Sequence, residues 1–267
     1  MKSSPFSWIM LILSSLVLLF IIAPLAGIFL NTNGSQLIET VNDREVRESI
    51  RLTLLVAFAA TFLFAFAAIP LAWILARKDF PLKGVVQGII DLPVVIPHTA
   101  AGIAILGFIS RDGFLGGIAG SVGLSLINNP AGIALAMAFV SLPFLINSAR
   151  DGFASVPVRL EKAALTLGAS PSRVFFTISL PLAWRSVMTG FVMMFARGMS
   201  EFGAVVIVAY HPMIAPVMIY ERFNNFGLDY ARPVSVLFIT VALAVFILLR
   251  LVSLKKKDSH NTADAET

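Results

Sequence analysis

The sequence predicts an all-α protein that crosses a membrane six times. Of its 267 residues, 58% are hydrophobic and only 13% carry a charge, whereas soluble domains are nearer half apolar and a quarter charged. The mean hydropathy is +0.89, and the apolar residues are collected in runs of roughly the 20 residues that a helix needs to cross a bilayer core. This distribution excludes a soluble enzyme, a coiled coil and a disordered chain.

Six runs are long enough to span a bilayer. The first follows Lys2 and resembles a signal peptide, but it is longer than the roughly 7–15 apolar residues of a signal core, so we interpret it as a retained anchor. The six expected spans cover residues 6–30, 52–76, 85–109, 131–149, 187–209 and 234–252.

The third span contains two prolines one turn apart, Pro93 and Pro97. A proline inside a helix frees a carbonyl, which lipid cannot satisfy. The small residues at 100–102 then permit close approach of a neighbouring helix. We therefore expect a kinked, buried third helix, with Asp91 as a charge near its N-terminus.

The fifth span contains Arg197 and Glu201, the only charged pair inside any of the six runs. At positions i and i+4 the two side chains lie on one face of a helix. Intramembrane charges are costly and face the protein interior or a water-filled path. The favoured interpretation is a structural ion pair that fixes this helix against its neighbours.

The distribution of Lys and Arg predicts the orientation, because positive residues are retained on the cytoplasmic side. Placing both termini inside gives 13 inner residues: Lys2, Arg77, Lys78, Lys83, Arg150, Arg159, Lys162, Arg173, Arg185, Arg250, Lys255, Lys256 and Lys257. The outer loops then hold six: Arg44, Arg47, Arg51, Arg111, Arg222 and Arg232. The basic excess of +5 thus orients the chain, and no nucleic-acid partner is expected.

The expected organisation is one membrane domain over residues 1–257 followed by a polar cytoplasmic tail over 258–267. The longest inner segment, 150–186, predicts two short helices joined by a turn, with an Ala- and Leu-rich face for a partner. Capping rules place residues at both ends of each helix. These are Ser155 and Pro157 at the start of the first helix, Gly168 at its end, Ser170 and Pro171 at the start of the second, and Pro181 at its end.

This segment resembles the "EAA" loop of ABC-importer permease subunits, which docks into a groove of the ATPase subunit. The resemblance rests on Ala163-Ala164, then Gly168, then Ile178-Ser179-Leu180-Pro181 after nine residues. One position departs from the family pattern: Lys162 stands where the acid usually lies, and Glu161 is one place earlier. The residues that the resemblance assigns to ATPase coupling are Glu161, Lys162, Ala163, Ala164, Gly168, Ala169, Pro171 and Pro181.

Two further segments narrow the resemblance. Residues 195–204, Phe-Ala-Arg-Gly-Met-Ser-Glu-Phe-Gly-Ala, resemble the fifth-helix signature of molybdate, tungstate and sulfate importers. Residues 91–98, with 76–81, look most like archaeal-type tungstate/molybdate permeases. The chain is thereby identified as similar to the permease of a molybdate/tungstate importer with the type I fold, with sulfate or another oxyanion as the alternative.

The resemblance also implies partners. Two copies of the chain would surround a central path, with two ATPase subunits beneath and an oxyanion-binding protein above, and ATP binding would drive alternating access. The chain itself lacks a phosphate-binding loop, since of its seven lysines only Lys2 precedes a serine. We therefore expect no cofactor on this chain, and ATP with Mg on the ATPase.

The residues expected in the path or in helix packing are Pro93, Pro97, His98, Arg197, Ser200 and Glu201. For Arg197 the functional alternative is that it attracts a dianion, while Glu201 prevents the anion from being trapped. His98 could donate to an oxyanion, but a histidine at a kink more often satisfies a freed carbonyl.

Two other function classes compete with a transport subunit of an importer. A membrane enzyme needs a catalytic or metal-binding cluster, and the chain offers only His98, His211 and His260 and no cysteine. An ion-coupled secondary transporter needs intramembrane carboxylates, for which Glu201 is the only good candidate, and often shows internal repeats. We therefore expect neither catalytic residues nor a metal site.

Overall fold

The computed structural model describes residues 5–254, so Lys2, Lys255–Lys257 and the expected tail at 258–267 lie outside the described residues. Every regular element within 5–254 is helical, as the sequence predicts. The elements are α1 Pro5–Leu30, α2 Gly34–Asn42, α3 Arg44–Arg77, α4 Lys83–Val95, α5 His98–Ile109, α6 Phe114–Ser121, α7 Pro130–Ser155, α8 Val158–Thr166, α9 Pro171–Val174, the π-helix η1 Phe175–Ser179, α10 Leu180–Met199, α11 Gly203–Val208, α12 Ala215–Phe226 and α13 Leu228–Leu254.

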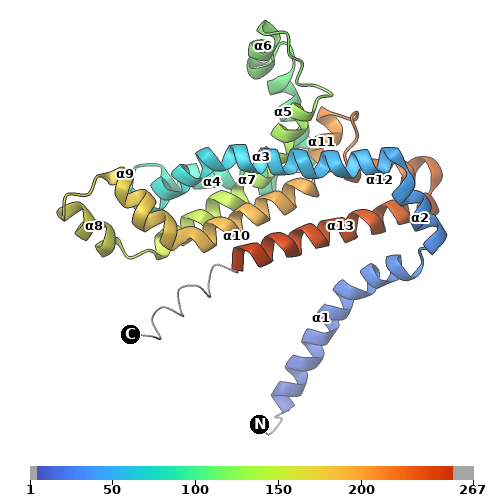
Figure 1. Cartoon of the computed structure of the whole chain (residues 1–267), viewed down its shortest axis with the longest axis horizontal. Coiled ribbons are helices and arrows are strands. Elements are labelled where there is room, and N and C mark those ends of the chain that lie inside the picture. Colours follow the sequence, from blue (N-terminus) through green and yellow to red (C-terminus); the bar gives the residue numbers. More distant parts are fainter. Residues whose placement is uncertain (1–4, 255–267) are drawn as a thin grey trace.

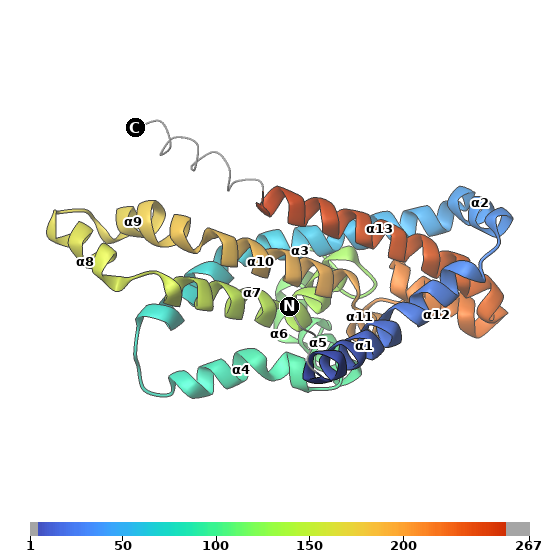
Figure 2. The same cartoon turned by 90° about the horizontal axis from the view of Figure 1, so that it is seen from below.

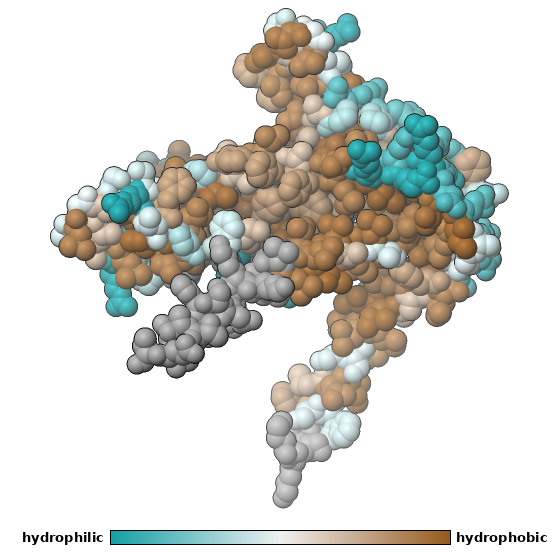
Figure 3. Space-filling view, viewed as in Figure 1, coloured by the Kyte–Doolittle hydropathy of each residue, from teal (hydrophilic) through white to brown (hydrophobic). Residues whose placement is uncertain are grey.

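The long helices α3, α7, α10 and α13 run side by side and form a bundle (Figure 1). Helices α8 and α9 lie beyond one end of the bundle, here called the hairpin end, and α2 and α12 lie at the opposite or far end (Figures 1 and 2). Hydrophilic residues gather at both ends, while the surface between them is mainly hydrophobic (Figure 3). This distribution is the one a bilayer requires.

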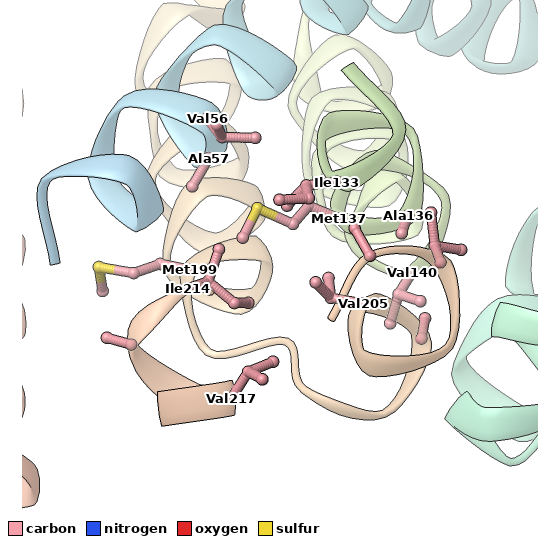
Figure 4. Packing of buried hydrophobic residues seen from close by; sticks show 14 of the residues in the cluster. Val56, Ala57, Ile133, Ala136, Met137, Val140, Met199, Val205, Ile214 and Val217 are labelled. Carbon is pink, nitrogen blue, oxygen red and sulfur yellow. The ribbon is translucent and has the colours of Figure 1, made fainter. Parts of the chain in front are cut away.

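Helix α7 lies at the centre of the bundle, since 56% of the residues in its most apolar stretch are buried. In the far half, Ile133 and Met137 of α7 pack with Val56 of α3 and Val205 of α11 (Figure 4). In the hairpin half the buried contacts involve many alanines, which allow α3, α7 and α10 to approach closely. The core therefore joins α4, α5 and α10, which carry the candidate path residues, while α8 and α9 contribute nothing to it.

Five described helices are long and apolar enough to cross a membrane, and α4 with α5 makes a sixth crossing if the pair is counted as one span. The prediction of a kinked, buried third helix is wrong in two respects: the span is broken into two helices, and the first of them is not buried. The chain bends by 111° between the two halves, and Pro93 is the only buried residue of α4. Pro97 causes the break, because a proline forces the preceding residue into extended backbone, as the ψ of 148° at Ile96 shows.

The predicted fifth span also has the wrong bounds. Helix continues from Pro171 to Met199, so Pro181 does not end the second hairpin helix. Within η1 the N–H of Leu180 donates to the carbonyl of Phe175, which restarts the α-helix at Leu180. Pro181 therefore lies in a first turn, where its missing N–H costs little.

Helices α5 and α11 follow two breaks in the chain and pack tightly against each other. A Cβ on Gly102 of α5 would lie 2.8 Å from the carbonyl oxygen of Ala204. Gly102→Ala is therefore expected to force the two helices apart and to cost about 1–3 kcal/mol, measured by thermal unfolding of the purified protein. The matched control is Gly107→Ala in the same helix, where no atom lies within 4 Å; an equal loss in both variants would contradict the packing argument.

Candidate functional site

The segment after α7 forms the helical hairpin that the sequence predicts. The N–H of Ala169 donates to the carbonyl of Ala164, and that of Gly168 donates to the carbonyl of Leu165, which is the hydrogen-bond pattern of a Schellman motif. Gly168 has a φ of +88°, a left-handed conformation that favours glycine. The predicted end of the first hairpin helix is confirmed.

The start of the second hairpin helix is also confirmed, because the Ser170 hydroxyl accepts a hydrogen bond from the N–H of Arg173 and Pro171 occupies the first turn. The predicted start of the first helix is wrong. Ser155 ends α7 instead, and its hydroxyl donates to the carbonyl of Gly152. Pro157 stands directly before α8. It has no backbone N–H to donate within α7, so α7 cannot continue through it.

Three residues join the hairpin to the bundle. The Arg77 guanidinium at the end of α3 donates to both carboxylate oxygens of Glu161, at 2.8 and 2.9 Å, and to the carbonyl of Val156 at 3.0 Å. The Ser179 hydroxyl donates to the same carboxylate at 2.6 Å. The Arg77 and Glu161 side chains are only 8% and 9% exposed. We call Arg77, Glu161 and Ser179 the hairpin junction.

The ionisation of Glu161 follows from these contacts. Burial alone would raise the pKa of its carboxyl group, but the hydrogen bonds from Arg77 and Ser179 and the charge of Arg77 outweigh burial and lower the pKa below the ordinary value of 4.5. Glu161 is therefore charged at neutral pH. Its carboxylate binds within this chain and does not form the exposed face of the hairpin.

The exposed face of the hairpin consists of other predicted residues. Lys162, Ala163 and Gly168 are exposed. The apolar side chain of Leu167, which directly follows α8, is 88% exposed beside them, and α8 itself lies beyond the end of the hydrophobic bundle (Figure 1). Val158, Leu160 and Leu165 of α8 are exposed as well, and exposed apolar groups that gather in this way mark contact surfaces for other proteins.

A second cluster of ionisable residues lies where the two helix breaks meet. One terminal nitrogen (Nη2) of Arg197 lies 2.9 Å from Glu201 Oε2 and 2.9 Å from each ring nitrogen of His98, and His98 Nδ1 lies 3.1 Å from the same Glu201 oxygen. Glu201 Oε1 accepts a hydrogen bond from the N–H of Ala204 at the start of α11. We call His98, Arg197 and Glu201 the charge cluster.

The predicted Arg197–Glu201 ion pair is thus confirmed, although Glu201 lies beyond the end of α10 rather than on one helical face with Arg197. The favoured role of His98 is wrong: the structure places its ring against Arg197 and Glu201 and shows no contact with a freed carbonyl in residues 5–254. The hydroxyl of Ser200 donates to the carbonyl of Arg197. Pro93 and Pro97 lie on either side of the α4–α5 break.

Asp91 does not serve as an N-terminal charge. It is the ninth residue of α4, which begins at Lys83, and its carboxylate accepts a hydrogen bond of 2.6 Å from the side chain of Asn147 in α7. The sequence analysis also missed a contact at the far end, where Arg222 of α12 donates to Asp43 at 2.6 Å. Burial raises the pKa of Asp43, but the hydrogen bonds from Arg222 and the N–H of Glu45 outweigh it and leave the pKa below its usual value.

The comparisons with known proteins agree with this architecture. Residues 68–256 match the family described as binding-protein-dependent transport system inner membrane component. The chain belongs to this family. The family is a transport component, so the prediction of a transport subunit rather than an enzyme is confirmed, as is the prediction of an integral membrane protein.

Individual relatives are similar over most of their length. The molybdate/tungstate transport system permease protein WtpB of Thermococcus kodakarensis is 43% identical over 89% of this chain and 92% of its own. The probable sulfate transport system permease protein cysT of Chlorokybus atmophyticus is 32% identical over 74% and 70%. Among solved structures, a chain of a bacterial ABC transporter involved in the import of alginate superposes with a TM-score of 0.73 at 17% identity, covering 94% of this chain and 96% of that one. The fold is that of type I ABC importer permeases.

Proposed function

We propose that this chain is the permease subunit of an ATP-driven importer for molybdate or tungstate. The observation that carries the proposal is its 43% identity to a molybdate/tungstate permease over 89% of the chain. Sulfate is the second candidate, supported by the 32% identity to a probable sulfate permease.

The proposed complex contains two copies of this chain, two ATPase subunits that bind ATP with Mg, and an external oxyanion-binding protein. The exposed hairpin face supports docking of the ATPase, because it presents Leu167 together with Lys162, Ala163 and Gly168 outside the bundle. The positive residues near the hairpin end support a cytoplasmic location for that end and for both termini. ATP-driven movement of the hairpins would then rock the bundle between inward- and outward-open states.

The proposal is tested by uptake of labelled tungstate and molybdate into proteoliposomes that contain this chain, its ATPase and its binding protein. We expect ATP-dependent uptake that excess sulfate does not suppress. Suppression by sulfate would keep the mechanism and change the substrate. Uptake driven by an ion gradient without the ATPase would overturn the proposal.

Gly168→Val is expected to uncouple ATP hydrolysis from transport. Valine at a φ of +88° is strained, by more than the roughly 1–2 kcal/mol that left-handed backbone costs an ordinary residue, so the Schellman turn must rearrange. The measurement is the ratio of tungstate taken up to ATP hydrolysed, which should fall several-fold. Gly123→Val is the matched control, because Gly123 has a φ of +79° but lies between α6 and α7; normal coupling in Gly168→Val would remove the docking assignment.

A further inference from the structure

One face of α10 carries polar side chains along its length. Four of its exposed or partly exposed residues recur every four positions, and Ser200, directly after the helix, continues the row, so the five lie on one side of the helix. They are Arg185, Thr189, Met193, Arg197 and Ser200, all polar except Met193, and are here called the α10 stripe. From Arg185 to Arg197 the stripe extends about 18 Å along the helix axis, at a rise of about 1.5 Å per residue.

The two arginines of the stripe have unused hydrogen-bond donors. The side chain of Arg185 makes no hydrogen bond or ion pair with any residue in 5–254. Arg197 uses only Nη2 for the charge cluster, so its Nε and Nη1 have no partner in the same range. Its guanidinium is 23% exposed, whereas the carboxylate of Glu201 behind it is fully buried.

Lipid is an unsuitable environment for this face. Between Leu243 and Leu248 of α13, in the same bundle, every exposed residue is apolar, for example Leu243 and Ile247. Arg185 could reach the membrane interface from the hairpin end, but Arg197 lies about 18 Å farther along α10. A charged side chain at that depth faces the protein interior or water.

We propose that the α10 stripe lines the anion path and that Arg197 and His98 form a transient binding site for a tetrahedral oxyanion within it. The choice of ligand class rests on the proposed function. The free Nε and Nη1 of Arg197 form a planar pair of donors that matches two oxygens of such an anion. His98, whose side chain is 36% exposed, lies on the same side of Glu201.

The buried carboxylate of Glu201 limits the affinity of this site. It holds Arg197 and His98 in position and offsets much of the positive charge, so an arriving dianion is attracted without being held. A conduction site requires this balance, because the ion must leave as readily as it enters. Glu201 is thus a positioning residue that does not contact the anion.

The absence of cysteine from the chain makes single-cysteine labelling a direct test. Thr189→Cys and Met193→Cys are placed on the stripe, and Leu243→Cys on the apolar face of α13 is the control. In proteoliposomes of the full complex, membrane-impermeant methanethiosulfonate reagents on both sides should label the two stripe positions and leave Leu243→Cys unlabelled. A stripe that remains unlabelled would overturn the path assignment, because it would then be covered by lipid or by the second copy.

The role of Arg197 is tested by comparing an anionic with a cationic reagent of this type at Met193→Cys. Arg197 is one helical turn away, so adding Arg197→Gln should lower the anionic-to-cationic rate ratio by about tenfold at low ionic strength. An unchanged ratio would overturn the binding site. Neither measurement depends on which substrate is carried.

The ligand is tested by protection. Tungstate should slow labelling of Met193→Cys when Arg197 is present and not in the Arg197→Gln background. Protection by sulfate but not by tungstate or molybdate would keep the site and contradict the proposed substrate. Failure of all three anions to protect a labelled stripe would overturn the oxyanion site itself.

Discussion

Glu161→Gln is expected to reduce ATP-driven oxyanion uptake by about tenfold or more while ATP hydrolysis continues. The change preserves the shape of the side chain but removes the charge that faces the buried Arg77 guanidinium. Breaking a buried ion pair by removing one partner costs about 3–5 kcal/mol. Because this pair joins α8 to the end of α3, its loss should let the hairpin move without moving the bundle.

The measurement is uptake and ATP hydrolysis by the same proteoliposomes. Asp151→Asn is the matched control, since Asp151 is 70% exposed and its ion pair with Arg150 lies at the surface, where such pairs contribute little. Exchanging the partners, Arg77→Glu with Glu161→Arg, should restore part of the coupling. If Glu161→Gln couples normally, the hairpin junction does not transmit motion.

The pH dependence of the junction follows from the lowered pKa of Glu161. Because the pKa is lower in the folded state, the ion pair contributes its full stability above the ordinary pKa of 4.5 and loses it only as the pH falls through the lowered folded value. Coupling should therefore be insensitive to pH between neutral and mildly acidic conditions. A loss of coupling in that range must arise from another group.

Features set by a few neighbouring residues could be predicted from the sequence. The Schellman turn depends on Gly168 and the adjacent chain, and the cap of the second helix depends on Ser170 and Pro171. The apolar runs depend only on composition over a window of about 20 residues. Each of these signals is local; the turn and the cap are confirmed, and the runs predict the number of spans although two of them have the wrong course or bounds.

Features that join distant segments could not be predicted in this way. Arg77 and Glu161 are 84 residues apart, and His98 and Arg197 are 99 residues apart, so no spacing rule relates them. The end of α10 at Met199 was also missed, because hydropathy continues through the break. Two signals in the sequence pointed toward these contacts: Pro97, which marks a helix break beside His98, and Glu161, an acid that lies one place before the position usual in the family.

Glu201→Ala is expected to have the largest effect on stability. The Glu201 side chain is fully buried against Arg197 and His98, and it also accepts the N–H of Ala204. Its removal leaves the Arg197 charge without its partner, at about 3–5 kcal/mol, and removes a cap at the start of α11, at about 1 kcal/mol. The apparent melting temperature of the purified complex should fall by many degrees. Glu48→Ala is the control, since Glu48 is 63% exposed in a surface pair with Arg44 and should leave the melting temperature unchanged.

Glu201→Gln separates the two roles of this side chain. A glutamine oxygen can still accept the N–H of Ala204, so the cap remains, while the negative charge behind Arg197 is lost. If Arg197 contacts the transported anion, the uncompensated charge should bind it more tightly and release it more slowly, and both KM and maximal uptake should fall. If the ion pair is purely structural, Glu201→Gln should lower the melting temperature and leave KM unchanged. A fall in KM in this one variant therefore indicates a site in the anion path, and an unchanged KM indicates a purely structural ion pair.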